Sequence, residues 1–144
     1  MGCDIHAFVE FYNTRTNNWQ DGNIYVPNAS YGISASEPKL TIADYQFTSR
    51  NYSLFTALAN VRGHGGICDP RGLPPGISKE LFVELGLWAG DAHSTSYFTL
   101  EELKFHLGQY PVLQPMIDEL CYIPIILGTY SSDNHIRVTF WFDN

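Results

Sequence analysis

The N-terminal stretch Cys3-Asp4-Ile5-His6-Ala7-Phe8-Val9-Glu10-Phe11-Tyr12 alternates between two sets of side chains. The odd-numbered residues are all apolar, whereas the even-numbered residues combine two acids and a histidine with two aromatic rings. A period of two, carried by β-branched and aromatic residues, is typical of a β-strand. We therefore expect a strand over residues 3–12 whose odd-numbered side chains face the core. Its other face is either solvated or, because Phe8 and Tyr12 share it, partly covered.

The C-terminal stretch alternates in the same way. The residues expected to face the core are Ile136, Val138, Phe140 and Phe142, and those expected to face away are His135, Arg137, Thr139 and Trp141. Residues 123–130 are interpreted as a preceding strand, joined to the strand 135–143 by a turn at 131–134, which makes a β-hairpin. We expect the last strand to lie near the strand 3–12, where Arg137 pairs with Asp4 or Glu10.

The middle of the chain carries helical patterns. Apolar residues recur at helical spacing after capping residues, which are Ser49, Ser78 and the capping box Thr99–Glu102. These patterns predict helices near 50–62, 78–87 and 100–120. The helix 78–87 is expected to bury Leu81, Phe82 and Leu85.

The remaining segments complete the predicted fold. Residues 19–26 are predicted to form a second strand, and breaker-rich or polar residues predict loops at 27–48, 63–76 and 90–97. The expected fold class is α+β, with one domain spanning residues 1–144. A mostly antiparallel sheet includes both termini, and three to four helices pack on it, against one face.

Length and charge narrow the class of protein. The chain has 144 residues, which favours one domain, and a formal net charge of −7. Only eight residues are Lys or Arg, so the basic stripe of a general nucleic-acid binder is missing. The longest apolar run, 123–127, contains Pro124 and is far shorter than a membrane span. The first residues lack a signal-peptide pattern, and we expect a protein of the reduced cytoplasm.

Residues 90–99 concentrate an acid, an imidazole, hydroxyls and a phenol ahead of a helix start. Loops held at one end by a helix often carry ligand contacts. This stretch contains Asp91-x-His93, and the first strand contains Asp4-x-His6. Because unpaired buried polar groups are costly, we expect the two Asp-x-His segments to lie close together. At least one arginine should line the same cavity, from among Arg50, Arg62 and Arg71.

The chain contains five distinctive blocks of sequence: MGCDIH at 1–6, RNYxLFxxLAxVR at 50–62, PRGLP at 70–74, DxHSxSYxTLxEL at 91–103 and FWFDN at 140–144. Together they resemble a family of small bacteriophage and prophage proteins. The resemblance spans nearly the whole chain, apart from residues 13–48. It implies a phage accessory protein that acts in the cytoplasm of a bacterial host, and it brings no activity with it.

The first functional hypothesis is a protein that binds a small, anionic, nucleotide-like ligand and so sequesters a bacterial defence signal. Arginines would bind the phosphate, and aromatic rings such as Phe98 or Trp141 would stack on the base. Hydroxyl and acidic side chains would form hydrogen bonds with the hydroxyl groups of the ligand. The link to defence is an analogy from the phage context. No general nucleic acid or membrane is expected as a partner, and a homo-oligomer stays open. The candidate ligand-binding residues are Asp4, His6, Arg50, Tyr52, Arg62, Arg71, Asp91, His93, Ser94, Ser96 and Tyr97.

The second hypothesis is a metal-dependent hydrolase of a phosphoester or an amide. Asp4, His6, Asp91 and His93 offer nitrogen and oxygen ligands suited to zinc or manganese, with an open position for an activated water. Nucleophilic catalysis by Ser94 with His93 or His6 is weaker, because the strand-turn-helix elbow is missing. An inhibitor of a host protein is the remaining alternative.

The three cysteines, Cys3, Cys68 and Cys121, are predicted to stay out of disulfide bonds. Their number is odd, and their spacing fits neither a disulfide framework nor a zinc ribbon. Thiol titration of the denatured, non-reduced protein should find three free thiols per chain. Finding one would contradict this prediction.

Overall fold

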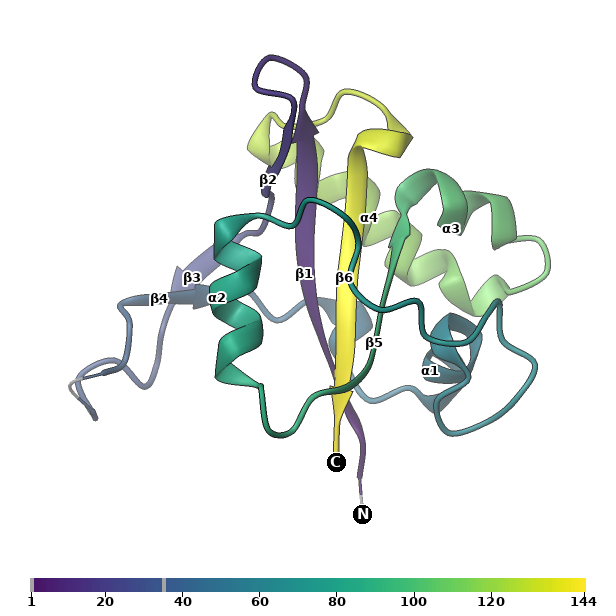
Figure 1. Cartoon of the computed structure of the whole chain (residues 1–144), viewed down its shortest axis with the longest axis horizontal. Helices are drawn as coiled ribbons and strands as arrows, with labels where there is room; N and C mark the ends of the chain where they lie inside the picture. Colours follow the sequence, from purple (N-terminus) through teal and green to yellow (C-terminus); the bar gives the residue numbers. More distant parts are fainter. Residues whose placement is uncertain (1, 35) are drawn as a thin grey trace.

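Both ends of the chain lie side by side in the middle of a four-stranded antiparallel sheet (Figure 1). The computed structural model describes residues 2–34 and 36–144, and its strand order is β2-β1-β6-β5. The strands are β1 (Asp4–Asn13), β2 (Asn18–Asp21), β5 (His93–Thr99) and β6 (Ile136–Asp143). The predicted α+β fold, with one domain and a mostly antiparallel sheet containing both termini, is confirmed.

One face of the sheet carries the main core. Ile5, Ala7 and Val9 of β1 and the even-numbered residues of β6 are buried there, and Phe11 packs against them partly buried, which confirms the alternation expected at both ends. The helices on this face are α1 (Tyr52–Ala59), α3 (Leu100–His106) and α4 (Gln114–Leu127). The predicted capping box starts α3. The cap of α1 is Asn51 instead of Ser49, because the Asn51 side chain accepts a hydrogen bond from the backbone N–H of Leu54.

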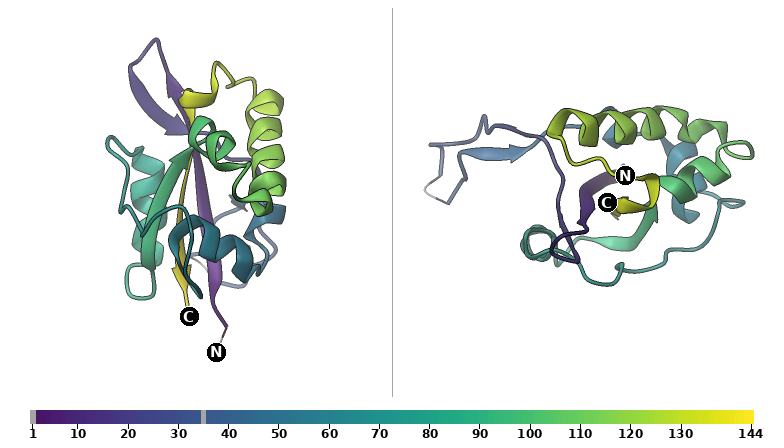
Figure 2. Two further views of the ribbon diagram at one scale, coloured as in Figure 1. Left: turned by 90° about the vertical axis from the view of Figure 1, so that its right-hand side faces the viewer. Right: turned by 90° about the horizontal axis from the view of Figure 1, so that it is seen from above.

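The opposite face is covered by α2 (Lys79–Leu87), which begins at the predicted cap Ser78 (Figure 2). Phe8, Leu81 and Trp141 form a second buried cluster between this helix and the sheet. The expectation that all helices lie against one face is therefore wrong. Both faces carry large apolar side chains, and each needs a cover of its own. The expected burial of Phe82 is also wrong, because its side chain is 71% exposed.

The predicted C-terminal hairpin is wrong. Residues 123–127 belong to α4, which ends at Gly128 in the left-handed conformation, with φ of 68°. Leu120, Ile123 and Pro124 are all buried, so the apolar run continues the inner face of a helix. Periodicity alone does not separate a short buried strand from a buried helical turn.

Two segments predicted as loops contain strands. Most of the predicted loop 90–97 belongs to β5, which pairs with β6 and has an irregularity between His93 and Ser96. In the predicted loop 27–48, β4 (Leu40–Ile42) pairs with β3 (Tyr25–Pro27) to form a separate two-stranded sheet. The predicted strand 19–26 is therefore divided between β2 and β3.

In the described residues, three short 3₁₀ helices connect the longer elements. They are η1 (Gln46–Thr48), η2 (Pro111–Leu113) and η3 (Asp133–His135). Across the described part of the chain, every helix is too short or too polar to cross a bilayer.

A buried ion pair joins the two central strands. Arg137 on β6 donates from Nε to Oε1 of Glu10 on β1 at 2.8 Å, and their side chains are 3% and 0% exposed. One of the two predicted partners of Arg137 is thereby confirmed. The guanidinium also donates to the carbonyl oxygens of Pro75 and Gly76, while Glu10 Oε2 accepts from the backbone N–H of Ser78. Burial lowers the pKa of Arg137, and the charge of Glu10 opposes that change.

Replacing Arg137 with methionine should lower the free energy of unfolding by about 3–5 kcal/mol, because Glu10 is then left as a buried charge without its counter-ion. Chemical denaturation measures this loss. The matched control is Lys104→Met, which removes an ion pair between two partly exposed side chains, Lys104 and Asp133, and should cost less than about 1 kcal/mol. Equal costs for the two variants would contradict the assigned role of the buried pair.

Candidate functional site

The outer edge of β1 is only half paired. Strand β2 pairs with Glu10–Asn13 and then ends. At Val9 the Asn23 side chain takes the place of a strand, because Val9 N–H donates to Asn23 Oδ1 at 2.9 Å and Asn23 Nδ2 donates to Val9 O at 3.2 Å. Alternate residues of a strand direct their N–H and C=O groups to the same side. Ile5 and Ala7 therefore turn theirs toward this edge, where the described residues place no strand.

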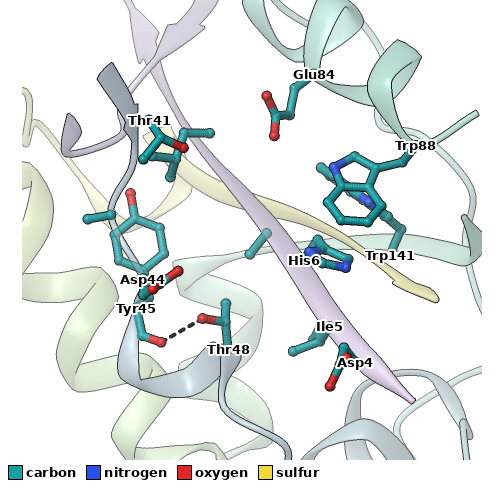
Figure 3. A pocket seen from close by; sticks show the side chains of 13 residues that line it. Asp4, Ile5, His6, Thr41, Asp44, Tyr45, Thr48, Glu84, Trp88 and Trp141 are labelled. Carbon is teal, nitrogen blue, oxygen red and sulfur yellow. Dashed lines mark hydrogen bonds between the residues drawn. The ribbon is translucent and has the colours of Figure 1, made fainter. Parts of the chain in front are cut away.

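A cavity of about 400 Å³ opens along this unpaired edge (Figure 3). Residues 4–7 of β1 form one wall, and residues 41–45 together with Thr48 form the wall across from it. Glu84 and Trp88, at the end of α2, lie over the cavity, and Trp141 of β6 completes the lining. The volume falls within the range of small-molecule pockets.

An aromatic stack closes one side of the cavity. The rings of His6 and Trp88 are 3.8 Å apart between centroids, at an interplanar angle of 30°. Trp141, opposite His6 on β6, lies 6.2 Å from it, and its indole nitrogen is buried without a hydrogen-bond partner among the described residues. His6 Nε2 lies 3.1 Å from Asp143 Oδ2. The imidazole is thus held both by stacking and by a carboxylate.

The lining is acidic. Asp4, Asp44 and Glu84 contribute carboxylates, and none of the lining residues is Lys or Arg. Burial raises the pKa of Glu84 above the usual range, while a hydrogen bond with Trp88 and the charge of His6 act in the opposite direction. At the rim, Arg50 Nη2 lies 2.8 Å from Asp4 Oδ1, in a pair whose side chains are about half exposed. The cavity therefore favours groups that donate hydrogen bonds or carry positive charge.

The structure does not bring the two Asp-x-His segments into one site. Strand β6 separates β1 from β5. His93 is opposite Phe142, on the main-core side of the sheet, and contacts Ser94 and Asn144, whereas His6 lies on the α2 side. Asp91 is exposed in the turn after α2. In residues 2–34 and 36–144, no three His, Cys, Asp or Glu side chains are grouped to hold a metal ion.

The predicted arginines are also dispersed. Arg71 covers the outer edge of β5, where its guanidinium donates to Tyr97 O and to Glu102 and lies 4.2 Å from the Tyr97 ring centroid. Ser96 accepts a hydrogen bond from the backbone N–H of Arg71. Arg62 lies over the Tyr52 ring, 5.2 Å from its centroid. Of the candidate ligand-binding residues, Asp4 and His6 line the cavity, and Arg50 reaches its rim through Asp4.

The sequence candidates did not include several of the lining residues, among them Asp44, Tyr45, Thr48, Glu84 and Trp88. Trp141, which also lines the cavity, was named from the sequence as a ring that would stack on a base. The sequence could have indicated Glu84 and Trp88 as lining residues. They are four residues apart and hence lie on one side of a helix. The even-numbered face of β1 needed a cover, and this helix was available to supply it. No local signal marks residues 41–48.

Glu84→Gln should flatten the pH dependence of stability. The pKa of Glu84 is raised in the folded state, so the folded protein binds more protons than the unfolded chain between the two pKa values. The free energy of unfolding therefore decreases as the pH rises from the pKa of an ordinary glutamate to the higher pKa in the folded state. Glu84→Gln should not show this decrease. Denaturation at several pH values measures the effect. Glu80→Gln, at an exposed position of the same helix, is the control, and an identical profile for both variants would refute the prediction.

Comparisons with known proteins leave the site to be interpreted from its own geometry. No protein-family model, no curated protein and no solved structure matches this chain.

Proposed function

We propose that this protein is a binding protein whose ligand occupies the cavity beside β1. The observation that carries the proposal is the unpaired edge at Ile5 and Ala7, which directs backbone donors and acceptors into a cavity of about 400 Å³. Ile5 is 3% exposed and Ala7 is 9% exposed, so little of either residue's surface is accessible to solvent. Buried backbone polar groups are nearly always paired. A ligand that supplies the missing partners would gain hydrogen bonds in a site that is already formed.

Binding is better supported than catalysis by the surroundings of His6. Its Nε2 is engaged by Asp143, and its ring is stacked against Trp88. The hydrolase alternative needs His6 and His93 on one metal ion, and they project from opposite sides of the sheet. In the Ser94 alternative, that hydroxyl lies 2.9 Å from His93 Nδ1, and neither residue lines the cavity.

The charge of the site argues against a phosphate-bearing ligand in this cavity. A phosphate would lie beside Asp4, Asp44 and Glu84, which repel it. Arg50 and Arg71 each hold a carboxylate already, at 2.8 and 2.9 Å. A nucleotide, adenosine monophosphate, is therefore included among the probes in the binding experiment below. The bacteriophage origin, the host cytoplasm, the link to defence and inhibition of a host protein stay predictions from the sequence.

Filling the cavity mouth should abolish binding. Thr41 is exposed and lines the cavity from β4, so Thr41→Trp places an indole where the ligand would lie. The ¹⁵N-labelled protein is titrated with adenosine monophosphate, glucose, butylamine and the capped tripeptide Ala-Lys-Ala, and the amide signals of Ile5 and Ala7 are followed by NMR. At least one probe should shift these signals saturably in the unsubstituted protein and not in Thr41→Trp.

The matched control is Thr14→Trp, at an exposed position in the turn between β1 and β2. It should bind the same probe as the unsubstituted protein. If no probe moves the two amides, or if Thr41→Trp binds as well as the control, the proposed function fails.

A further inference from the structure

We infer, building on the proposed function, that the ligand is an extended peptide segment with a basic side chain, which pairs with β1 as an added edge strand. The added strand would lie in the cavity beside residues 4–7 of β1, on the side that faces residues 41–45. It would continue the sheet on the side where β2 ends.

The backbone pattern of β1 supports a strand as the occupant. Ile5 and Ala7 each present an N–H donor and a C=O acceptor to the same edge, about 7 Å apart along the strand. A second strand carries the same alternation at the same spacing, which is the basis of peptide recognition by strand addition. A small amine would satisfy the carboxylates of the cavity and leave most of these backbone groups without partners.

The course of the chain near β2 leaves the edge of β1 at Ile5 and Ala7 without a paired strand in the described residues. After Asp21, Gly22 N–H donates to Val9 O at 2.9 Å and Asn23 bonds both backbone groups of Val9. The chain then turns away toward β3, and Ile24 is held by the Tyr45 hydroxyl. Pairing on this edge of β1 thus reaches Val9 and does not extend to Ala7, which lies two residues nearer the N-terminus.

Side-chain alternation places the basic residue. The peptide residue opposite His6 would point to the α2 side of the sheet, as His6 does. Glu84 and Trp88 lie there (Figure 3), so a Lys or Arg side chain would meet a carboxylate and an indole. The residues on either side, opposite Ile5 and Ala7, would point toward Tyr45 and Thr48. The acidic lining and the net charge of −7 complement a basic segment.

In the test, the whole protein is titrated with the capped tripeptide Ala-Lys-Ala. Binding is measured by NMR from the amide signals of Ile5 and Ala7. Three matched probes separate backbone pairing from charge: the same peptide N-methylated at both alanines, Ala-Glu-Ala, and butylamine. We expect Ala-Lys-Ala to bind at least about tenfold more tightly than each of the three, a difference of about 1.4 kcal/mol. Glu84→Gln should remove most of the preference for Lys over Glu in the peptide, and Glu80→Gln should keep it.

Each contrary outcome has a separate meaning. Equal binding of the N-methylated peptide or of butylamine would overturn strand addition and leave a ligand site in the cavity. Binding of adenosine monophosphate or Ala-Glu-Ala in preference to Ala-Lys-Ala would overturn the basic character of the ligand. If none of the probes, glucose included, moved the two amides, the proposed function would fail together with the inference.

Discussion

The buried pair Glu10–Arg137 holds the whole assembly in register. It joins the two central strands, and its remaining hydrogen bonds fix residues 75–78 against the sheet. Since Ser78 starts α2, the same contacts set where that helix crosses the sheet. Glu84 of α2 and Trp88, which follows the helix, line the cavity from that position. Two buried charges are tolerated because both Glu10 oxygens and three Arg137 nitrogens have partners, and any other register would leave some of these groups unpaired.

The fold could be predicted where a pattern is local. The alternation in β1 and β6 needs only neighbouring residues, and the capping box at Thr99 is complete within four residues. Prediction from sequence patterns was wrong where contacts between distant parts of the chain determine the secondary structure. Residues 123–127 fit a strand or a helix, and only their continuity with the buried face of α4 selects the helix. Strand β5 is polar in composition and is held by pairing with β6, which no local pattern reveals.

Of the residues that line the cavity, only two, both on β1, were predicted as candidate ligand-binding residues. Asp4 and His6 were found because they share the polar face of a recognisable strand. His93 was expected beside them, but its direction depends on the irregularity that begins at Ser94, where φ is 57°. A non-glycine residue rarely adopts this conformation, and nothing nearby in the sequence announces it. The opposite wall, residues 41–48, belongs to a segment without periodicity, and its place depends on long-range contacts such as the hydrogen bonds from the backbone of Gln46 and Phe47 to Glu119.

Exposed strand edges can pair with other chains, and in this protein the outer edge of β5 is covered. On β5, Gly72 N–H donates to Thr95 O and Arg71 donates to Tyr97 O, so a loop occupies the positions of a missing strand. Among the residues that the structure describes, no such loop pairs with the edge at Ile5 and Ala7, but carboxylates flank this edge. In a chain with net charge −7, carboxylates at an open edge repel a second copy of the same chain. The same charges attract a basic segment, so one feature both limits self-association and selects the partner that we propose.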